Sequence, residues 1–462
     1  MDSDKKKFRM FDVILTVICV VFVAEAAAPV AAIGNQQFFW WILLIVAFLL
    51  PYGLIAVELG TTYEGQGGMY DWVKRAFGNR MASRTAWYYW LNFPLWMASL
   101  AVMIPQILQI ITGDAIPTLP TIIIELAFIW IVVFISFYPV SDSVWILNGA
   151  AVLKMLLALT LGGLGIYGAM THGVANPFTL RSFLPTLDMK SISLISVIIF
   201  NMLGFEVVCT FTDSMENPKK QIPQAIIIGG IVIAAIYIFS SFGISAAIPT
   251  SQISRSSGMI DALQILTGQK TGMFIGIMAF IFMLTLFGNM ISWSLGVNNV
   301  VQYAAEDGNM PKVFIGKSKK NGMPIGVSIM NGIVATVVVV IAPFMPNQDL
   351  FWSFFGLNLV MFLSSYVPMF PAFLKLRKID PDKERPFKVG GSNFVVKLAA
   401  YAPMIIAIIA IILTAVPLSA DDIGAKLPIT VGAVIGYGFE EIFIRVKRIK
   451  NEENEKLVKQ NQ

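Results

Sequence analysis

The chain has 462 residues and a formal net charge of +5; 56% of its residues are hydrophobic and only 13% are charged. A soluble protein carries about twice that share of charged residues, so the composition excludes an ordinary soluble domain. Apolar runs long enough to cross a bilayer core of roughly 30 Å recur along the chain, which predicts an all-α integral membrane protein.

We expect twelve membrane-spanning helices, joined by loops that leave no room for a large domain outside the membrane. The expected spans cover residues 9–34, 38–60, 85–112, 121–139, 142–170, 192–213, 222–248, 272–304, 325–345, 349–375, 393–417 and 425–446. Residues 1–8 and 447–462 are expected to form short polar tails, and the last stretch, NEENEKLVKQNQ, is expected to fray.

The distribution of lysine and arginine supports one orientation of these spans. If the N-terminus lies in the cytoplasm, 27 of the 33 basic residues fall in cytoplasmic segments and 5 fall in outer segments. Short cytoplasmic loops of membrane proteins carry such an excess of basic residues. We therefore expect a multi-pass protein of a bacterial plasma membrane with both termini in the cytoplasm.

The first span, in the stretch VFVAEAAAPVAAIG, contains a carboxylate close to a helix breaker. Glu25 lies between alanines, and Pro29 follows it. A carboxylate in an apolar span is strongly unfavourable unless it meets a cation, a proton or hydrogen-bond donors. Three roles for Glu25 stay open: it binds an amine of a substrate, it carries a proton, or it pairs with Lys154 in the fifth span.

Aromatic residues cluster in the third span, at Tyr88, Tyr89 and Trp90. They either line a cavity or pack between helices. We expect two of the three to pack, and Tyr89 is the candidate for the cavity. Most tryptophans are expected to anchor spans at the membrane interface, as Trp40, Trp41 and Trp352 do by their positions near span ends.

The sixth span reads IIFNMLGFEVVCTFTD and is also interrupted, with Asn201, Gly204 and Glu206 in its middle. Interrupted helices in corresponding positions of two halves of a chain indicate an inverted-repeat transporter. Backbone groups exposed at such breaks are tolerated only where they line a cavity or meet a solute. We therefore expect Glu25 and Glu206 to lie beside a substrate cavity, although Glu206 is also compatible with a hydrogen-bonded structural carboxylate.

Residues that bind metals or support histidine-based catalysis are scarce. The two cysteines, Cys19 and Cys209, lie in apolar runs without metal-ligand spacing, and the one histidine, His172, lies in a polar loop. A membrane enzyme would need clustered polar groups at one membrane face. We therefore expect no enzyme activity, no metal and no cofactor. The positive charge is a topology signal and implies no nucleic-acid partner.

Three loop motifs follow spans two, six and eight: ELGTTYEGQGGMYDWVKRAFG, ENPKKQIPQAI and AAEDGNMPKVFIGKSKKNGMP. Together and in this order they resemble the loops of the amino acid–polyamine–organocation (APC) superfamily. The resemblance covers about residues 9–446. The spacing of Glu25 and Pro29 and the stretch MISWSLG in span eight are similar to the branch of bacterial glutamate/GABA antiporters and related amino acid–amine exchangers.

This resemblance implies the LeuT-type fold, with two inverted five-helix repeats and breaks in spans one and six. The first repeat would occupy residues 9–170 and the second 192–376, with spans eleven and twelve at 393–446 outside both repeats. Substrate would bind at mid-membrane between the two breaks. Spans eleven and twelve form a dimer interface in some relatives, so a homodimer is a further expectation.

The resemblance also implies roles for individual residues. Family members bind a substrate carboxylate at span-one amides, often in Gly-Ser-Gly, where this chain has Glu25, Ala26, Ala27 and Ala28. This departure replaces part of a neutral site with a negative charge. Glu206 occupies a position that in the family often belongs to a gate or a proton path.

Two further roles are implied in spans five and eight. Lys154 matches a lysine that stands where sodium-coupled relatives hold an ion, with Asn289, Ser292 and Ser294 as its candidate partners. Trp293 matches an aromatic residue that packs on substrate, and a cation over an indole face gains roughly 1–2 kcal/mol when desolvated.

The function that we expect is secondary transport of amino acids or amines, as a sodium-independent exchange of a cationic amine or amino acid for a related amine such as agmatine or putrescine. Three alternatives stay open: proton-coupled symport of amino acids, exchange of glutamate and GABA or of neutral amino acids, and a membrane receptor that does not transport. The lysine at position 154 favours exchange, and the two acidic residues at the breaks favour a cationic substrate.

Overall fold

The computed structural model describes residues 7–23, 30–186, 189–253, 258–344, 350–418 and 422–460. Within these ranges the secondary structure is helical, apart from an isolated bridge between Phe8 and Met215. Eleven helices in the described part are long and apolar enough to cross a membrane. The expectation of an all-α membrane protein is therefore confirmed.

The helices follow one another along the chain with short connections. The first half contains α1 (Met10–Val21), η2 (Ala31–Gln36), α3 (Gln37–Leu44), η3 (Ile45–Leu49), α4 (Leu50–Thr62), α5 (Gly68–Phe77), α6 (Asn79–Ala101), α7 (Met103–Thr112), α8 (Thr118–Ile135), α9 (Val140–His172) and α10 (Leu180–Phe183). The second half contains α11 (Met189–Phe200), η4 (Phe205–Ser214), α12 (Pro218–Ala247), η5 (Thr250–Gln252), α13 (Gly258–Thr267), α14 (Met273–Glu306), η6 (Lys312–Ile315), α15 (Ile325–Ile341), η7 (Ala342–Phe344), α16 (Leu350–Tyr366), α17 (Met369–Ile379), α18 (Asn393–Ala415) and α19 (Ile423–Gln460).

Residues 9–34 do not form one continuous spanning helix. Helix α1 has only 12 residues, and the residue after it, Phe22, has the extended angles φ −75° and ψ 108°. The next described residue, Val30, is helical, and the chain kinks at Gly34 (φ 69°) before it continues into α3. Twelve residues are too few to cross a bilayer core. The described residues thus contain eleven helices of spanning length, plus the short α1.

Two expectations from the sequence are wrong. Helix α19 runs to Gln460, through the stretch expected to fray. Trp41 is not an interface anchor: its side chain is only 1% exposed and stacks on Tyr237 with ring centroids 4.9 Å apart.

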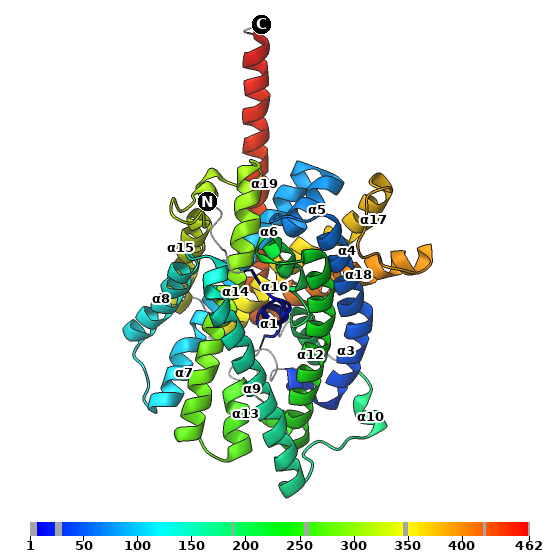
Figure 1. Ribbon diagram of the computed structural model, residues 1–462. Coiled ribbons are helices and arrows are strands. Elements are labelled where there is room, and N and C mark those ends of the chain that lie inside the picture. The colour runs from blue at the N-terminus through cyan, green and yellow to red at the C-terminus, as the bar shows by residue number, and fades with distance from the viewer. Residues whose placement is uncertain are drawn as a thin grey trace.

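Helix α1 lies in the centre of the bundle, surrounded by longer helices that include α9, α12 and α14 (Figure 1). Glycines allow α9 and α12 to cross closely, because a methyl group on Gly165 would lie 2.1 Å from the carbonyl oxygen of Gly243. Small residues permit such contacts between membrane helices. Because α9 and α12 both pack on α1, their side chains reach the end of α1 from two sides.

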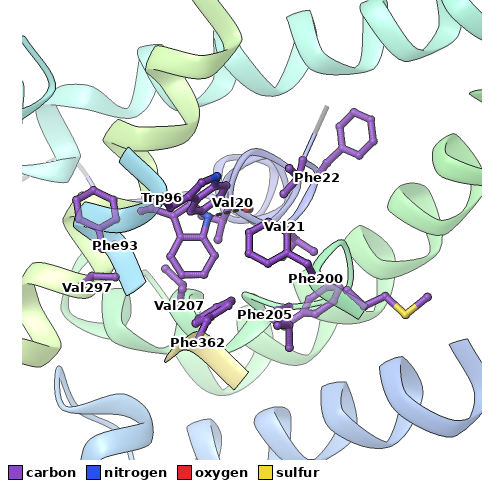
Figure 2. Close-up of a cluster of buried hydrophobic side chains, with 14 of the residues drawn as sticks. Val20, Val21, Phe22, Phe93, Trp96, Phe200, Phe205, Val207, Val297 and Phe362 are labelled. Atoms are coloured by element: carbon purple, nitrogen blue, oxygen red, sulfur yellow. Dashed lines mark hydrogen bonds between the residues drawn. The ribbon is translucent and has the colours of Figure 1, made fainter. Parts of the chain in front are cut away.

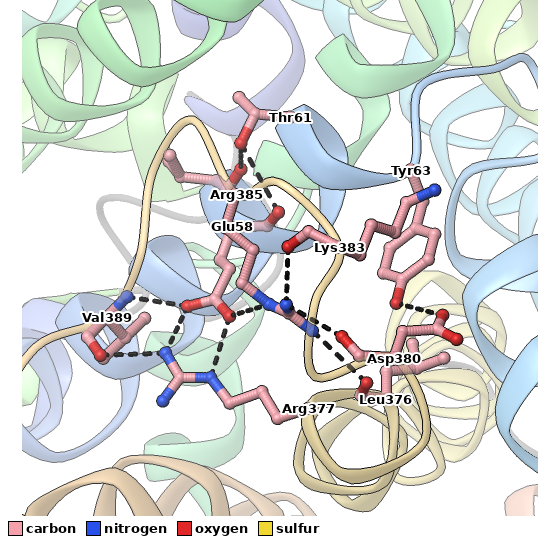
Figure 3. A network of polar contacts seen from close by, with 10 residues as sticks. Glu58, Thr61, Tyr63, Leu376, Arg377, Asp380, Lys383, Arg385 and Val389 are labelled. Carbon is pink, nitrogen blue, oxygen red and sulfur yellow. Dashed lines mark hydrogen bonds and ion pairs between the residues drawn. The ribbon is translucent and has the colours of Figure 1, made fainter.

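A buried ionic network connects α4 to the loop after α17, at the end of the bundle that also carries α5 (Figures 1 and 3). Glu58, near the end of α4, is 1% exposed. It accepts hydrogen bonds from Arg377 (2.8 and 2.5 Å) and from the backbone N–H of Val389 (2.6 Å). Arg385 lies 3.3 Å from the same carboxylate. Two arginines and a backbone donor thus compensate the buried charge.

Candidate functional site

The end of α1 leaves backbone groups that side chains of other helices satisfy. Tyr237 of α12 accepts a hydrogen bond from the backbone N–H of Val23 at 2.7 Å and donates to the carbonyl of Val23 at 3.3 Å. Its ring packs edge-on against Phe22 at 4.7 Å. An aromatic residue of another span therefore holds the chain where it leaves the helix. The candidate site residues Glu25, Ala26, Ala27 and Ala28 follow directly in the sequence and lie outside the described residues.

Lys154 of α9 also reaches the end of α1. Its ammonium donates to the carbonyl oxygens of Cys19 and Phe22, both at 2.6 Å, and to Asn289 Oδ1 of α14 at 3.0 Å. The side chain is fully buried. The structure thus brings together Lys154, span one and Asn289, the partners that the family resemblance implies. Sodium-coupled transporters with broken spanning helices use unwound carbonyls of this kind to coordinate the ion.

The sixth span is broken at the residues that the sequence indicates. Helix α11 ends at Phe200, residues 201–204 are not helical, and η4 begins at Phe205. Gly204 has φ +110°, and a methyl group on it would lie 2.8 Å from the ring of Trp293. Only glycine adopts this conformation readily, so Gly204 both makes the break and lets Trp293 pack on it. Asn201 is buried and lines a small crevice with Trp41 and Tyr237.

Glu206 lies just after this break inside a cage of tyrosines. Its carboxylate accepts hydrogen bonds from the hydroxyl groups of Tyr52, of Tyr89 at 3.0 Å and of Tyr366. Tyr52 Oη also accepts from the backbone N–H of Gly204 at 3.2 Å. The carboxylate is 1% exposed and connects α4, α6 and α16 with the broken span. Three hydroxyl donors thus satisfy the hydrogen-bonding capacity of this buried carboxyl group.

Buried aromatic side chains cluster beside the end of α1 and the broken sixth span, among them Phe22, Trp96 and Phe200 (Figure 2). Trp293 Nε1 donates to the carbonyl of Val20 at 2.8 Å, so the indole is fixed against the last turn of α1. Trp96 and Phe362 pack edge-on against Trp293, with ring centroids 5.4 and 5.1 Å apart. Phe200, the last residue of α11, contacts Trp96 at 5.1 Å. Indole faces and a nearby carboxylate suit a ligand that is both cationic and partly apolar.

Other candidate residues from the sequence form hydrogen bonds within their own helix or with helices α15 and α19. Ser292 Oγ donates to the carbonyl of Asn289, and Ser294 Oγ donates to that of Ile291, both within α14. Tyr88 donates to Glu440 of α19 at 3.4 Å, and Trp90 donates to Asn331 of α15 at 2.8 Å. Of the three aromatic residues in span three, Tyr89 is therefore the one at the cage. Its expected contact with substrate stays a prediction.

Sequence reasoning missed Tyr52, Tyr366, Tyr237 and Trp96. Each is a buried aromatic residue in an apolar span, a composition equally typical of helix packing. Their importance comes from contacts with residues far away in the sequence, which periodicity does not report. In the described part of the chain no group of three or more His, Cys, Asp or Glu side chains is arranged to hold a metal ion.

Comparison with known proteins gives a consistent assignment. The model of the family described as "Amino acid permease" matches residues 8–439. A Lactococcus lactis protein named a probable agmatine/putrescine antiporter, AguD, is 63% identical over 449 residues, which cover 97% of this chain and 96% of that protein.

More distant relatives are also transporters. An uncharacterized transporter of Legionella pneumophila is 25% identical over 90% of this chain and 91% of its own length. A glutamate/gamma-aminobutyrate antiporter of Lactococcus lactis is 24% identical over 80% of this chain and 76% of its own length. The family match at residues 8–439 spans both breaks, Lys154 and the tyrosines around Glu206.

Proposed function

Because the chain belongs to the amino acid permease family of the APC superfamily and is a multi-pass membrane transporter rather than an enzyme, we propose that it exchanges agmatine for putrescine across the cytoplasmic membrane. The observation that carries the proposal is the 63% identity, over nearly the full length of both chains, to the protein named a probable agmatine/putrescine antiporter. Identity at this level over 97% of the chain includes the whole region between the two breaks.

The charges at the candidate site support a cationic substrate. Glu206 is a buried carboxylate within hydrogen-bond reach of three tyrosines, and Glu25 adds a second carboxylate in the sequence directly after α1. Agmatine and putrescine each carry a positive group at both ends. If both acidic groups act on one binding site, they attract such diamines and repel a dicarboxylic substrate. We assign Glu25 to substrate binding, with Ala26, Ala27 and Ala28 supplying backbone groups.

The aromatic cluster complements this charge. Trp293 presents a ring between the end of α1 and Gly204, and a guanidinium or ammonium group over an indole face gains roughly 1–2 kcal/mol when desolvated. Asn201 and Tyr89 complete the proposed binding surface. The four-carbon chain of putrescine, shared by agmatine, would lie along the aromatic side chains, where apolar surface is removed from water.

Lys154 supports exchange that needs no sodium. Its ammonium occupies the position between the carbonyls of α1 and Asn289. A tethered cation there satisfies the broken helix without a free ion, so we propose that the gradient of one amine drives the other. Glu206 and its tyrosines connect four spans, and we propose that this cage opens and closes as the cavity alternates between the two sides.

In the same proposal, the number, arrangement and orientation of the membrane spans follow the pattern of the family. We infer twelve spans, in which α1 and the chain that follows it form the first, arranged as two inverted repeats at residues 9–170 and 192–376. Rocking spans one, two, six and seven against the rest would give alternating access. Both termini would lie in the cytoplasm, and spans eleven and twelve would form the contact of a homodimer in the bilayer.

Counterflow in proteoliposomes tests the function. Vesicles are loaded with unlabelled agmatine, putrescine, arginine, glutamate or GABA, and the entry of labelled agmatine is followed in sodium or choline buffer. We expect entry with internal agmatine or putrescine, at equal rates in both buffers, and background entry with glutamate or GABA. Counterflow driven by glutamate and GABA alone would instead support the second candidate, which the 24% identical antiporter suggests. Binding of agmatine without counterflow would indicate a receptor.

A further inference from the structure

A basic cavity of about 640 Å³ lies away from the central site, between the last turn of α17 and the first turns of α18. It is at the end of the bundle that carries α5, and Phe77 of α5 forms part of its wall. Five cationic side chains line it: Lys375, Arg377, Lys378, Lys388 and Lys397. A cavity of this volume is within the usual size range of ligand pockets.

Little of this positive charge is neutralised by the protein. Arg377 is engaged by Glu58 and by the carbonyl of Val389 (Figure 3). Across the described part of the chain, no ion pair with a carboxylate is found for the four lysines, and no acidic side chain lines the cavity. Lys375 lies over the ring of Phe77, at 4.9 Å from its centroid, which holds its ammonium at the cavity wall. The cavity therefore has an excess of positive charge.

Backbone N–H groups at the start of α18 add to the positive potential of the cavity. The first turn of α18 faces the cavity through Asn393, Val396 and Lys397, and the glycines at 390 and 391 line it before the helix starts. The amino end of a helix carries unpaired N–H groups that favour anions. Glycines leave room for a ligand to approach the main chain. The helix end and the lysines thus act on the same space.

The cavity also borders an exposed apolar surface. Along the first turns of α18, Phe394 is 74% exposed and Leu398 is 53% exposed, in a helix of spanning length and apolar composition. Tyr401, which lines the cavity, is 43% exposed. Exposed apolar side chains next to clustered lysines are what a phospholipid meets, with its acyl chains on the former and its headgroup on the latter.

The general excess of lysine on one side of the membrane does not require lysines to gather around one cavity. An excess of lysine on one side of the membrane explains charged loops, such as the exposed Lys319 and Lys320 before α15, but not four lysines around one cavity. We propose that the cavity binds the phosphate group of an anionic phospholipid, phosphatidylglycerol or cardiolipin, in the leaflet on the side of α5 and α17. This leaflet is the cytoplasmic one in the proposed orientation.

Native mass spectrometry of the purified full-length protein tests this assignment. The protein is equilibrated with an equimolar mixture of phosphatidylglycerol and phosphatidylethanolamine, and the retained lipids are counted. The double variant Lys388→Gln/Lys397→Gln is compared with Lys319→Gln/Lys320→Gln, which removes the same charge from the same side. About 1 kcal/mol for each lysine near an anionic surface corresponds to a roughly 10–30-fold loss of preference for phosphatidylglycerol in the first variant. The control is expected to keep the wild-type preference.

Several results would overturn the proposal: an unchanged preference in Lys388→Gln/Lys397→Gln, an equal loss in both double variants, or no preference in the wild type. A parallel arm adds millimolar inorganic phosphate to protein in uncharged lipid. Stabilisation by phosphate that depends on Lys388 and Lys397, without a preference for phosphatidylglycerol, would assign the cavity to a soluble phosphate compound instead. If the double variant does not fold, Lys397→Gln alone gives the same comparison. Lipid retention is independent of counterflow, so it stands apart from the proposed function.

Discussion

The ammonium group of Lys154 donates a 2.6 Å hydrogen bond to the carbonyl oxygen of Phe22, the first residue after α1 ends. This contact fixes the break in the first span to the middle of α9. Together with the bonds to Cys19 and Asn289, it gives the ammonium three oxygen acceptors, two from the first span and one from α14. The conformation of the first break therefore depends on the protein's own cation.

Removing that cation is expected to abolish exchange. In Lys154→Gln the neutral amide cannot reach all three acceptors, and a buried acceptor left unpaired costs about 1–3 kcal/mol. We expect at least a tenfold loss of agmatine counterflow and a lower Tm, neither restored by sodium. Lys426→Gln, on the periphery at an ion pair with Asp422, is the control and is expected to keep exchange. Wild-type counterflow in Lys154→Gln would show that the lysine is dispensable.

The tyrosine cage predicts a graded response at Glu206. Glu206→Gln keeps an acceptor for the tyrosine hydroxyls but removes the charge, so we expect the protein to fold while agmatine counterflow falls by at least tenfold. Tyr89→Phe removes one of the hydrogen bonds and leaves the carboxylate. We expect it to lower the stability by about 1 kcal/mol and to reduce counterflow less than Glu206→Gln does. Equal counterflow in Glu206→Gln and wild type, measured at matched protein amounts, would remove the charge from the mechanism.

The acidic residue of the first break is expected to discriminate between substrates. Glu25→Gln should raise the KM for agmatine at least tenfold, because the substrate's positive end loses its counter-charge in a site of low dielectric. Glu384→Gln, an exposed carboxylate in the loop after α17, is the matched control and should leave the KM unchanged. If Glu25→Gln transports agmatine with the wild-type KM, this residue is not part of the substrate site.

A candidate functional position can be predicted from the sequence where a charged residue or a glycine interrupts an apolar span. A glycine followed by a glutamate in an apolar span is a local signal, and the span does break at Gly204. The contacts of Lys154 are implied by the family resemblance and do not follow from a local signal. Tyr52 and Tyr366 lie in unremarkable apolar helices and meet at Glu206 only in the fold. The position of Trp41 near a span end predicts an interface anchor, but packing on Tyr237 buries its side chain.

Gly204 is expected to tolerate no side chain. Its φ of +110° is unfavourable for any other residue, and a methyl group there would meet Trp293 at 2.8 Å. Gly204→Ala should therefore lower stability by about 1–3 kcal/mol and reduce counterflow, because Trp293 must move away from the break. Gly163→Ala in α9, where a methyl group meets no atom within 4 Å, should be neutral or slightly stabilising. Similar Tm values for the two variants would contradict the role of Gly204.

The network around Glu58 is expected to govern stability more than substrate affinity. Glu58→Gln leaves Arg377 and Arg385 without their shared carboxylate in a buried position, where breaking an ion pair costs about 3–5 kcal/mol. The pKa of the nearby Tyr63 is raised, chiefly by burial and also by its hydrogen bond to Asp380, so that contact persists through neutral pH and contributes separately. We expect Glu58→Gln to lower the Tm clearly while the KM for agmatine stays the same, and Tyr63→Phe to lower it less. A changed KM with an unchanged Tm would indicate that Glu58 acts on the substrate cavity rather than on the anchoring of α4.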